Sequence, residues 1–106
     1  YITGRIKEMI IVGGENVFPR EIEEVLNRHP SINASGVIGV VDPMRGEQPV
    51  AFVETKDEAR FDEHDLLRWC REHLAGYKVP ASIRRVEALP RNPTGKILRR
   101  ELKSLV

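Results

Sequence analysis

The chain has 106 residues, of which 41% are hydrophobic and 31% are charged, as is usual for one small globular domain. Its 17 basic and 16 acidic residues nearly cancel, so no net field favours nucleic acid or an anionic membrane as a partner. No apolar run approaches the roughly 20 residues of a transmembrane segment. The single cysteine, Cys70, excludes an internal disulfide and favours a reducing compartment, the cytoplasm.

The first quarter of the chain predicts a short strand followed by a helix. Residues 9–12 form an apolar run typical of a strand, and Gly13 and Gly14 end it. Pro19 is expected to begin the helix, because the N–H that proline lacks has no partner in a first helical turn. Apolar residues then recur at helical spacing until Pro30, which is expected to end the helix.

The middle of the chain predicts two strands and a second helix. Residues 37–41 and 50–55 are apolar runs separated by turn-forming residues, a pattern that indicates an antiparallel pair. Asp62 is expected to cap the N-terminus of the second helix, and Gly76 is expected to end that helix.

Two more elements complete the prediction. Residues 82–86 indicate a short strand, and residues 96–105 carry an apolar stripe at helical spacing. The expected order is β-α-β-β-α-β-α, which describes an α+β domain with a small, mainly antiparallel sheet flanked by about three helices.

Lys96 is the strongest candidate for chemistry. It follows the turn-forming sequence Pro93-Thr94-Gly95, which would hold the lysine stem while its ammonium reaches a phosphate or carboxylate. A phosphate-binding P-loop is excluded, because Gly-x-x-x-x-Gly-Lys-Ser/Thr requires glycine at position 90 and a hydroxyl residue at 97, where this chain has proline and isoleucine. Residue pattern alone leaves two readings open, a solvated surface lysine or a mobile electrostatic catalyst.

No metal site is expected. His29, His64 and His73 lack the spacing that would bring them together on one metal ion. They are expected at the surface or half-buried, and Trp69, beside the apolar face of its helix, is expected to be a packing residue rather than a ligand-binding one.

Two motifs resemble one known family. Residues 4–23 read Gly-Arg-Ile-Lys-Glu-Met-Ile-Ile-Val-Gly-Gly-Glu-Asn-Val-Phe-Pro-Arg-Glu-Ile-Glu, which resembles the start of the C-terminal domain of adenylate-forming enzymes. These enzymes are acyl-CoA synthetases, adenylation domains of peptide synthetases and luciferases. Residues 93–96 resemble the closing lysine motif of the same family. The resemblance implies that residues 1–106 are the C-terminal lid domain of a longer protein, whose large N-terminal domain is absent from this chain.

The resemblance also implies an activity. In this family a carboxylic acid attacks the α-phosphate of ATP, and a thiol, usually CoA, then displaces AMP from the acyl-adenylate. ATP and Mg2+ would lie mainly on the N-terminal domain, which is the expected partner of this lid. CoA and a small carboxylic acid are the other expected partners. The complete protein is expected to be an acid–thiol ligase in fatty acid metabolism or aryl-acid activation, and this fragment alone is expected to be inactive.

The residues that match the family motifs carry implied roles. Lys96 matches the catalytic lysine, which contacts the attacking carboxylate and the α-phosphate; acetylation would remove its charge. Lys7 matches the hinge about which the lid rotates between the two steps. Arg5 matches an arginine near the nucleotide.

A second set of residues matches the CoA side of the family. Gly13 and Gly14 match the loop that lines the pantetheine tunnel, where missing side chains leave room for a narrow thiol. Glu15 is expected either to pair with the lysine or to orient this loop. Tyr77 and Lys78 lie where some relatives contact the adenine and the phosphates of CoA.

Two alternatives to the CoA ligase lid stay open. One is a stand-alone binding or dimerisation module that kept the fold without catalysis. The other is the lid of an adenylation domain that serves a carrier protein instead of CoA.

Overall fold

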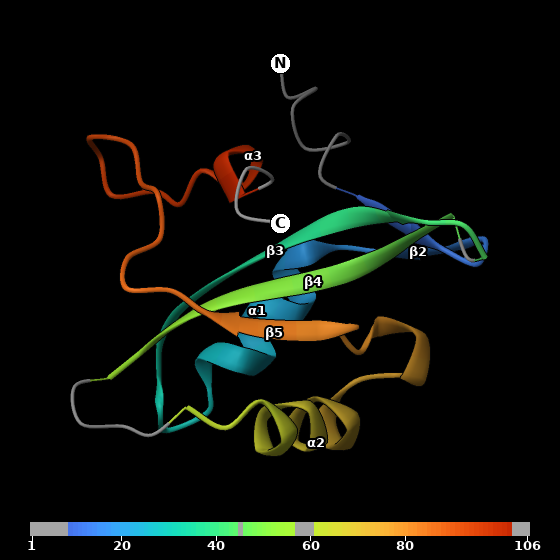
Figure 1. The fold of residues 1–106 in the computed structure, drawn as a ribbon, viewed down its shortest axis with the longest axis horizontal. Coiled ribbons are helices and arrows are strands. Elements are labelled where there is room, and N and C mark those ends of the chain that lie inside the picture. The colour runs from blue at the N-terminus through green and yellow to red at the C-terminus, as the bar shows by residue number, and fades with distance from the viewer. Residues whose placement is uncertain (1–8, 45, 57–60, 103–106) are drawn as a thin grey trace.

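The computed structural model describes residues 9–44, 46–56 and 61–102 as a five-stranded sheet with helices on both faces (Figure 1). In chain order the elements are β1 (Ile10–Val12), β2 (Glu15–Val17), α1 (Pro19–Asn27), β3 (Ile32–Asp42), β4 (Gly46–Thr55), α2 (Glu63–His73), the 3-10 turn η2 (Gly76–Lys78), β5 (Ser82–Arg85) and α3 (Arg99–Leu102). The predicted α+β class and the mainly antiparallel sheet are confirmed.

Strand β4 lies at the centre of the sheet. It pairs antiparallel with β3 along its whole length, antiparallel with β1 through Val12 and Gly46, and parallel with β5. The pairing of β1 with β2 extends the sheet beyond β1. Because successive strand residues point to opposite faces, an apolar central strand with both faces covered supports two separate cores.

The first core lies between the sheet and helices α1 and α2. Its buried members are Ile10, Val12, Val17, Ile22, Val25, Leu26, Ile32, Val37, Ala51, Val53, Leu66, Cys70 and Ile83. The second core is smaller and lies on the opposite face, beneath α3 and the segment before it. Its buried members are Ile38, Val50, Phe52, Leu89 and Leu102.

The start of the chain differs from the prediction, because the two glycines turn the chain back instead of only ending a strand. Gly13 and Gly14 have φ values of 56° and 87°, and positive φ at both central residues is the condition for a two-residue type I′ hairpin turn. Val12 therefore pairs with Glu15. The observed order begins β-β-α, so the prediction missed one strand.

The last helix was predicted to begin at Lys96, and this is wrong. Residue 97 forms an isolated antiparallel bridge with Arg91, which keeps the chain extended until α3 begins at Arg99. Helical spacing predicts that a helix is present but not its first residue, because element boundaries are the least determined feature of a periodic pattern. The part of the predicted helix beyond residue 102 lies outside the described residues.

The second helix follows the prediction at its start and departs from it at its end. The Asp62 side chain accepts a hydrogen bond from the backbone N–H of Asp65, as expected of an N-cap. The helix ends at His73, and Gly76 begins η2 instead of ending α2.

Gly36 in β3 forms the seat for the segment over the second core. A Cβ atom at this position would lie 2.8 Å from Leu102 Cδ1 and 3.4 Å from Ile97 Cγ2. The absence of a side chain thus allows α3 and residue 97 to approach the sheet closely.

We expect Gly36→Val to lower the free energy of unfolding by about 1–3 kcal/mol, because the added atoms overpack the second core. Urea unfolding of the 106-residue chain measures this change. Gly76→Ala is the matched control and should change the free energy by less than about 0.5 kcal/mol, since its added Cβ meets no atom within 4 Å. Wild-type stability in Gly36→Val would contradict the close approach.

Candidate functional site

A tight hairpin presents Lys96. We call residues 90–98 the lysine hairpin: the N–H of Leu98 donates to the carbonyl of Pro90 (2.8 Å), and the N–H of Asn92 donates to that of Lys96 (2.9 Å). The Gly95 N–H donates to the carbonyl of Asn92, and Gly95 has a φ of 91°. Asparagine first, proline second and glycine fourth are the residues that a type I turn followed by a left-handed residue favours.

The Asn92 side chain holds the interior of this turn. Its Oδ1 atom accepts from the N–H of Thr94 (3.1 Å), from the Thr94 hydroxyl (2.7 Å) and from the N–H of Lys96 (2.9 Å). Two of these partners are backbone N–H groups that only donate, which identifies the inward atom as the amide oxygen. The backbone of Lys96 is therefore fixed at both its N–H and its carbonyl.

The side chain of Lys96 points into solvent. Ile97 packs against the second core, and neighbouring residues of an extended arm point to opposite sides. Lys96 is exposed, and among the described residues its ammonium makes no hydrogen bond or ion pair. This arrangement combines a rigid backbone with a free positive charge.

A buried carboxylate fastens the base of the lysine hairpin to the sheet. Glu54, on β4, is 8% exposed and projects on the same face as Phe52. Its Oε2 accepts from Arg91 Nη1 (2.8 Å) and from the N–H of Leu89, while Oε1 accepts from Arg91 Nη2 and Asn33 Nδ2 (both 3.3 Å). Both oxygens are satisfied, and the guanidinium is bound in the bidentate manner that carboxylates favour.

The charges at this anchor stabilise each other. Partial burial alone would raise the pKa of Glu54, but hydrogen bonds from Arg91, Leu89 and Asn33 outweigh it and hold the pKa below its usual value. The hydrogen bond to Glu54 in turn raises the pKa of Arg91. The pair therefore stays ionised at neutral pH.

Sequence reasoning missed Glu54, Arg91 and Asn92. The Asn-Pro-x-Gly pattern contained a signal for Asn92, because asparagine at the first turn position bonds to the backbone ahead. Glu54 also left a signal, since a carboxylate at the end of the apolar run of β4 requires a partner. Nothing local indicated that the partner lies 37 residues away in Arg91.

The β1–β2 pair with its Gly13-Gly14 turn, called here the glycine hairpin, offers bare backbone to solvent. Both glycines are exposed, and a Cβ atom on either would meet no other atom within 4 Å. Glu15 is exposed as well, and within the described part of the chain its carboxylate makes no hydrogen bond or ion pair.

Tyr77 and Lys78 lie in η2, against helix α1. Tyr77 packs on the first core, and Lys78 Nζ binds Glu21 Oε1 at 2.6 Å. This hydrogen bond raises the pKa of Lys78. Burial alone would raise the pKa of Glu21, but the Lys78 contact and the backbone N–H of Phe18 bring it below its usual value. The ammonium predicted to meet CoA phosphates is thus engaged by a carboxylate here.

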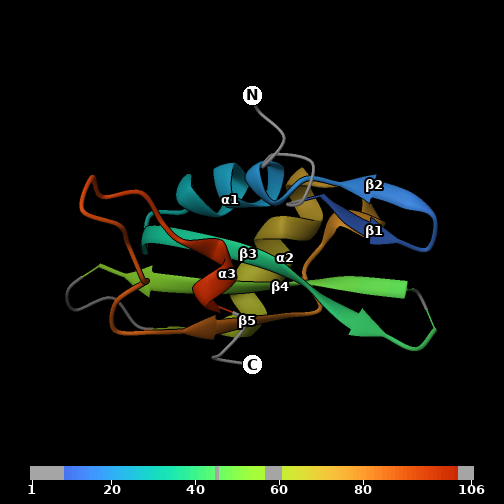
Figure 2. The ribbon, with the colours of Figure 1, turned by 90° about the horizontal axis from the view of Figure 1, so that it is seen from above.

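The two hairpins lie at opposite ends of the domain. In Figures 1 and 2 the orange-red segment before α3 extends to the left, and the blue glycine hairpin extends to the right. The fold therefore does not bring Lys96 together with Gly13 and Gly14. Arg5 and Lys7, the other predicted site residues, lie outside the described residues.

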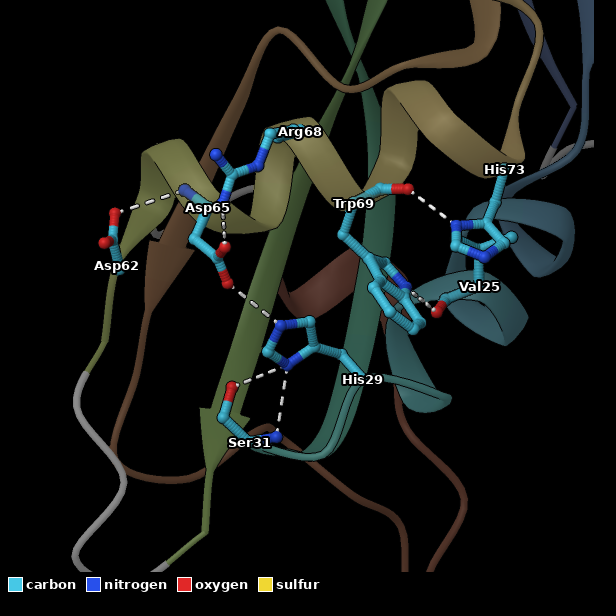
Figure 3. Close-up of polar contacts among 8 residues, drawn as sticks. All are labelled: Val25, His29, Ser31, Asp62, Asp65, Arg68, Trp69 and His73. Atoms are coloured by element: carbon cyan, nitrogen blue, oxygen red, sulfur yellow. Dashed lines mark hydrogen bonds and ion pairs between the residues drawn. The ribbon is translucent and has the colours of Figure 1, made fainter.

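A polar cluster between α1 and α2 has the composition of a hydrolytic triad (Figure 3). His29 Nε2 lies 3.1 Å from Asp65 Oδ2, and His29 Nδ1 lies 2.9 Å from the Ser31 hydroxyl. The backbone N–H of Ser31 also donates to Nδ1 (3.1 Å), so it shares the lone pair that a general base would need. We interpret the cluster, called here the clasp (His29, Ser31 and Asp65), as a structural link that holds the two helices together.

Trp69 contacts the clasp. Its indole N–H donates to the carbonyl of Val25 at 2.8 Å, and its ring contacts those of His29 and His73 (Figure 3). Its packing role confirms the prediction. Hydrogen bonds from Arg68, and then from His29, lower the pKa of Asp65.

Two kinds of feature are absent from the described residues. No group of three or more histidine, cysteine, aspartate or glutamate side chains is placed there to hold a metal ion. No helix in the described ranges has the length and apolar character needed to span a membrane.

Comparison with known proteins identifies the family. Residues 21–96, well over half of the chain, match the family described as AMP-binding enzyme C-terminal domain. The chain is 51% identical over its full 106 residues to 2-succinylbenzoate–CoA ligase of Geobacillus kaustophilus, of which it covers 22%. This chain belongs to the family of AMP-binding enzyme C-terminal domains, and it spans about a fifth of the length of the relatives it matches.

Solved structures agree with this assignment. A fatty acyl CoA synthetase of Mycobacterium tuberculosis superimposes with a TM-score of 0.88 at 42% identity, over 95% of this chain and 20% of that one. The o-succinylbenzoate CoA synthetase of Bacillus subtilis, solved with its acyl-adenylate intermediate, superimposes with a TM-score of 0.86 at 39% identity, over 92% of this chain and 20% of that one.

The depressed pKa of Glu54 predicts acid sensitivity. A carboxyl whose pKa is lower in the folded state stabilises the fold above its unfolded pKa, about 4.5, and this contribution is lost as the pH falls through the folded pKa. We expect the unfolding free energy of Glu54→Gln to fall less between pH 7 and pH 3 than that of the wild type. Glu21 and Asp65 account for part of the fall that remains.

Urea unfolding of the 106-residue chain at both pH values measures this difference. Glu24→Gln is the matched control, because Glu24 makes only an exposed ion pair with Arg20, and such pairs contribute little. If Glu54→Gln and Glu24→Gln lost equal stability on acidification, the anchor would not be ionised as described.

Proposed function

We propose that this chain is the mobile C-terminal domain of an ATP-dependent acyl- or aryl-CoA ligase. The observation that carries the proposal is an exposed lysine, fixed by its backbone at the tip of a rigid hairpin, in a chain of the AMP-binding family. The relatives named above are CoA ligases and synthetases, which favours CoA over a carrier protein as the acceptor.

The proposed reaction has two steps. A carboxylate oxygen of the acid attacks the α-phosphorus of ATP, and the bond to the pyrophosphate oxygen breaks, so that acyl-adenylate and pyrophosphate form. The thiol of CoA then attacks the acyl carbon, loses its proton and displaces AMP. ATP, Mg2+ and the acid lie mainly on the N-terminal domain in this proposal, and the protein acts in the cytoplasm.

Lys96 serves the first step. Negative charge accumulates where the carboxylate meets the α-phosphate, and a positive charge held there stabilises the transition state without transferring a proton. A fixed backbone supports this role, because electrostatic catalysis depends on groups that are in place before the reaction.

The separation of the two hairpins supports a rotation of the domain between the steps. One orientation of the domain presents Lys96 to a given site, and a different orientation presents Gly13 and Gly14, because the hairpins lie at opposite ends (Figures 1 and 2). Lys7 is the proposed hinge for this rotation, and Arg5 the proposed nucleotide contact.

The glycine hairpin serves the second step in this proposal. Without side chains, Gly13 and Gly14 leave room for the pantetheine arm of CoA, and Glu15 orients the loop. Tyr77 offers a ring for the adenine. Lys78 is paired with Glu21, so it binds a phosphate only by giving up this ion pair.

We expect Lys96→Ala in the complete enzyme to slow adenylation by about 10²–10³-fold, as the loss of one preorganised transition-state contact does. Pyrophosphate release, with 2-succinylbenzoate and straight-chain fatty acids as trial acids, measures this step. Thioester formation from CoA and supplied acyl-adenylate should stay near the wild-type rate.

Lys56→Ala is the matched control, because Lys56 is an exposed lysine at the end of β4, and it should leave both steps unchanged. Equal losses in the two steps of Lys96→Ala would contradict the proposed role.

We expect Gly14→Val to have the opposite effect: thioester formation should fall at least tenfold, because the side chain enters the proposed tunnel, while pyrophosphate release persists. Gly14→Ala is the control for backbone strain, since any side chain is strained at a φ of 87°. A selective loss of adenylation in Gly14→Val would refute the tunnel assignment.

A further inference from the structure

The lysine hairpin is built to fix its own tip. Its three interior donors converge on one atom, Asn92 Oδ1, and one of them is the backbone N–H of Lys96. The Lys96 carbonyl accepts from the N–H of the same asparagine. Both backbone groups of the lysine are thus bound by one residue, although the tip is exposed and contributes nothing to either core.

The base of the hairpin is fixed separately, and from the sheet. Glu54 binds the Arg91 guanidinium at two atoms and the N–H of Leu89 at the entrance to the hairpin. On the opposite arm, Ile97 is seated against the second core beside Gly36. Contacts therefore run from β4 through Arg91 and Asn92 to the backbone of Lys96.

These contacts fix the backbone from which the flexible side chain of Lys96 extends. A lysine side chain has four rotatable bonds and makes point contacts rather than a planar fork, so its ammonium is placed only as accurately as its Cα atom. A misplacement of about 1 Å in a reacting group can cost about 10²-fold in rate. The hairpin limits this error because the turn, its asparagine and its anchor determine where the lysine stem begins.

We propose that Asn92 and Glu54 are positioning residues for adenylation, and that they act by holding the backbone of Lys96. The inference rests on the proposed function, and it assigns roles to two residues that touch neither substrate nor nucleotide in that proposal. Asn92 acts at the tip and Glu54 at the base.

Asn92→Ala in the complete enzyme tests the positioning role of Asn92 at the tip of the lysine hairpin. We expect it to slow pyrophosphate release about 10–100-fold, with the acid used for Lys96→Ala, and to spare thioester formation from supplied acyl-adenylate. Thioester formation is an internal control for folding, because it requires the same domain. Asn92→Asp keeps the accepting oxygen and should restore most of the rate.

The double variant Asn92→Ala/Lys96→Ala separates positioning from general destabilisation. If Asn92 acts through Lys96, the double variant should be no more than about twofold slower in adenylation than Lys96→Ala, because the effects of coupled residues are non-additive. Multiplied effects of the two changes would overturn the inference. Glu54→Gln, alone and combined with Lys96→Ala, tests the anchor at the base of the lysine hairpin in the same way. We expect it to lower the adenylation rate about tenfold.

The outcomes separate this inference from the function on which it rests. If Lys96→Ala slows adenylation while Asn92→Ala leaves it unchanged, or slows both steps equally, the positioning role is overturned and the proposed function stands. If Lys96→Ala itself leaves adenylation unchanged, both are overturned.

Discussion

The ion pair between Glu54 and Arg91 is the contact on which the candidate site depends. It joins the central strand of the sheet to a hairpin that has little apolar surface of its own to bury. Burying a carboxylate is costly unless hydrogen bonds satisfy it, and here both oxygens accept twice. Because the ion pair has a defined direction and two parallel contacts, it locates the hairpin more narrowly than apolar packing alone would.

The two cores differ in what they hold in place. The first core unites two helices, three strands and the glycine hairpin, and it contains most of the buried apolar side chains. The second core is small, and it serves mainly to seat α3 and the lysine hairpin on the sheet.

Local pairing of charge explains how a domain with a net charge of +1 presents one exposed cation in its candidate site. Arg91 is bound by Glu54, Lys78 by Glu21, and Arg68 by Asp65. Lys96 stands apart from these pairs, because its neighbours in the hairpin bind its backbone and leave its side chain in water. Among the described residues, the electrostatic character of the site thus comes from an exposed charge outside these pairs, rather than from an excess of positive residues.

The sequence by itself determined the features that depend on neighbours along the chain. Apolar periodicity predicted helices α1 and α2 and the antiparallel pair β3–β4, the aspartate cap of α2 was visible in Asp62, and the turn chemistry of residues 93–95 singled out Lys96. Residue similarity in the motifs around positions 4–23 and 93–96 then indicated the family. These signals are local, because a cap, a turn or a periodic face is defined within a few residues.

Only the tertiary structure decided which distant residues meet. The partner of Glu54 lies 37 residues away, that of Lys78 lies 57 residues away, and residue 97 is extended because it faces Arg91 and packs on the second core. The same cause places the two hairpins at opposite ends of the domain (Figures 1 and 2). Strand pairing and side-chain burial depend on how the sheet assembles, and spacing along the chain does not encode that arrangement.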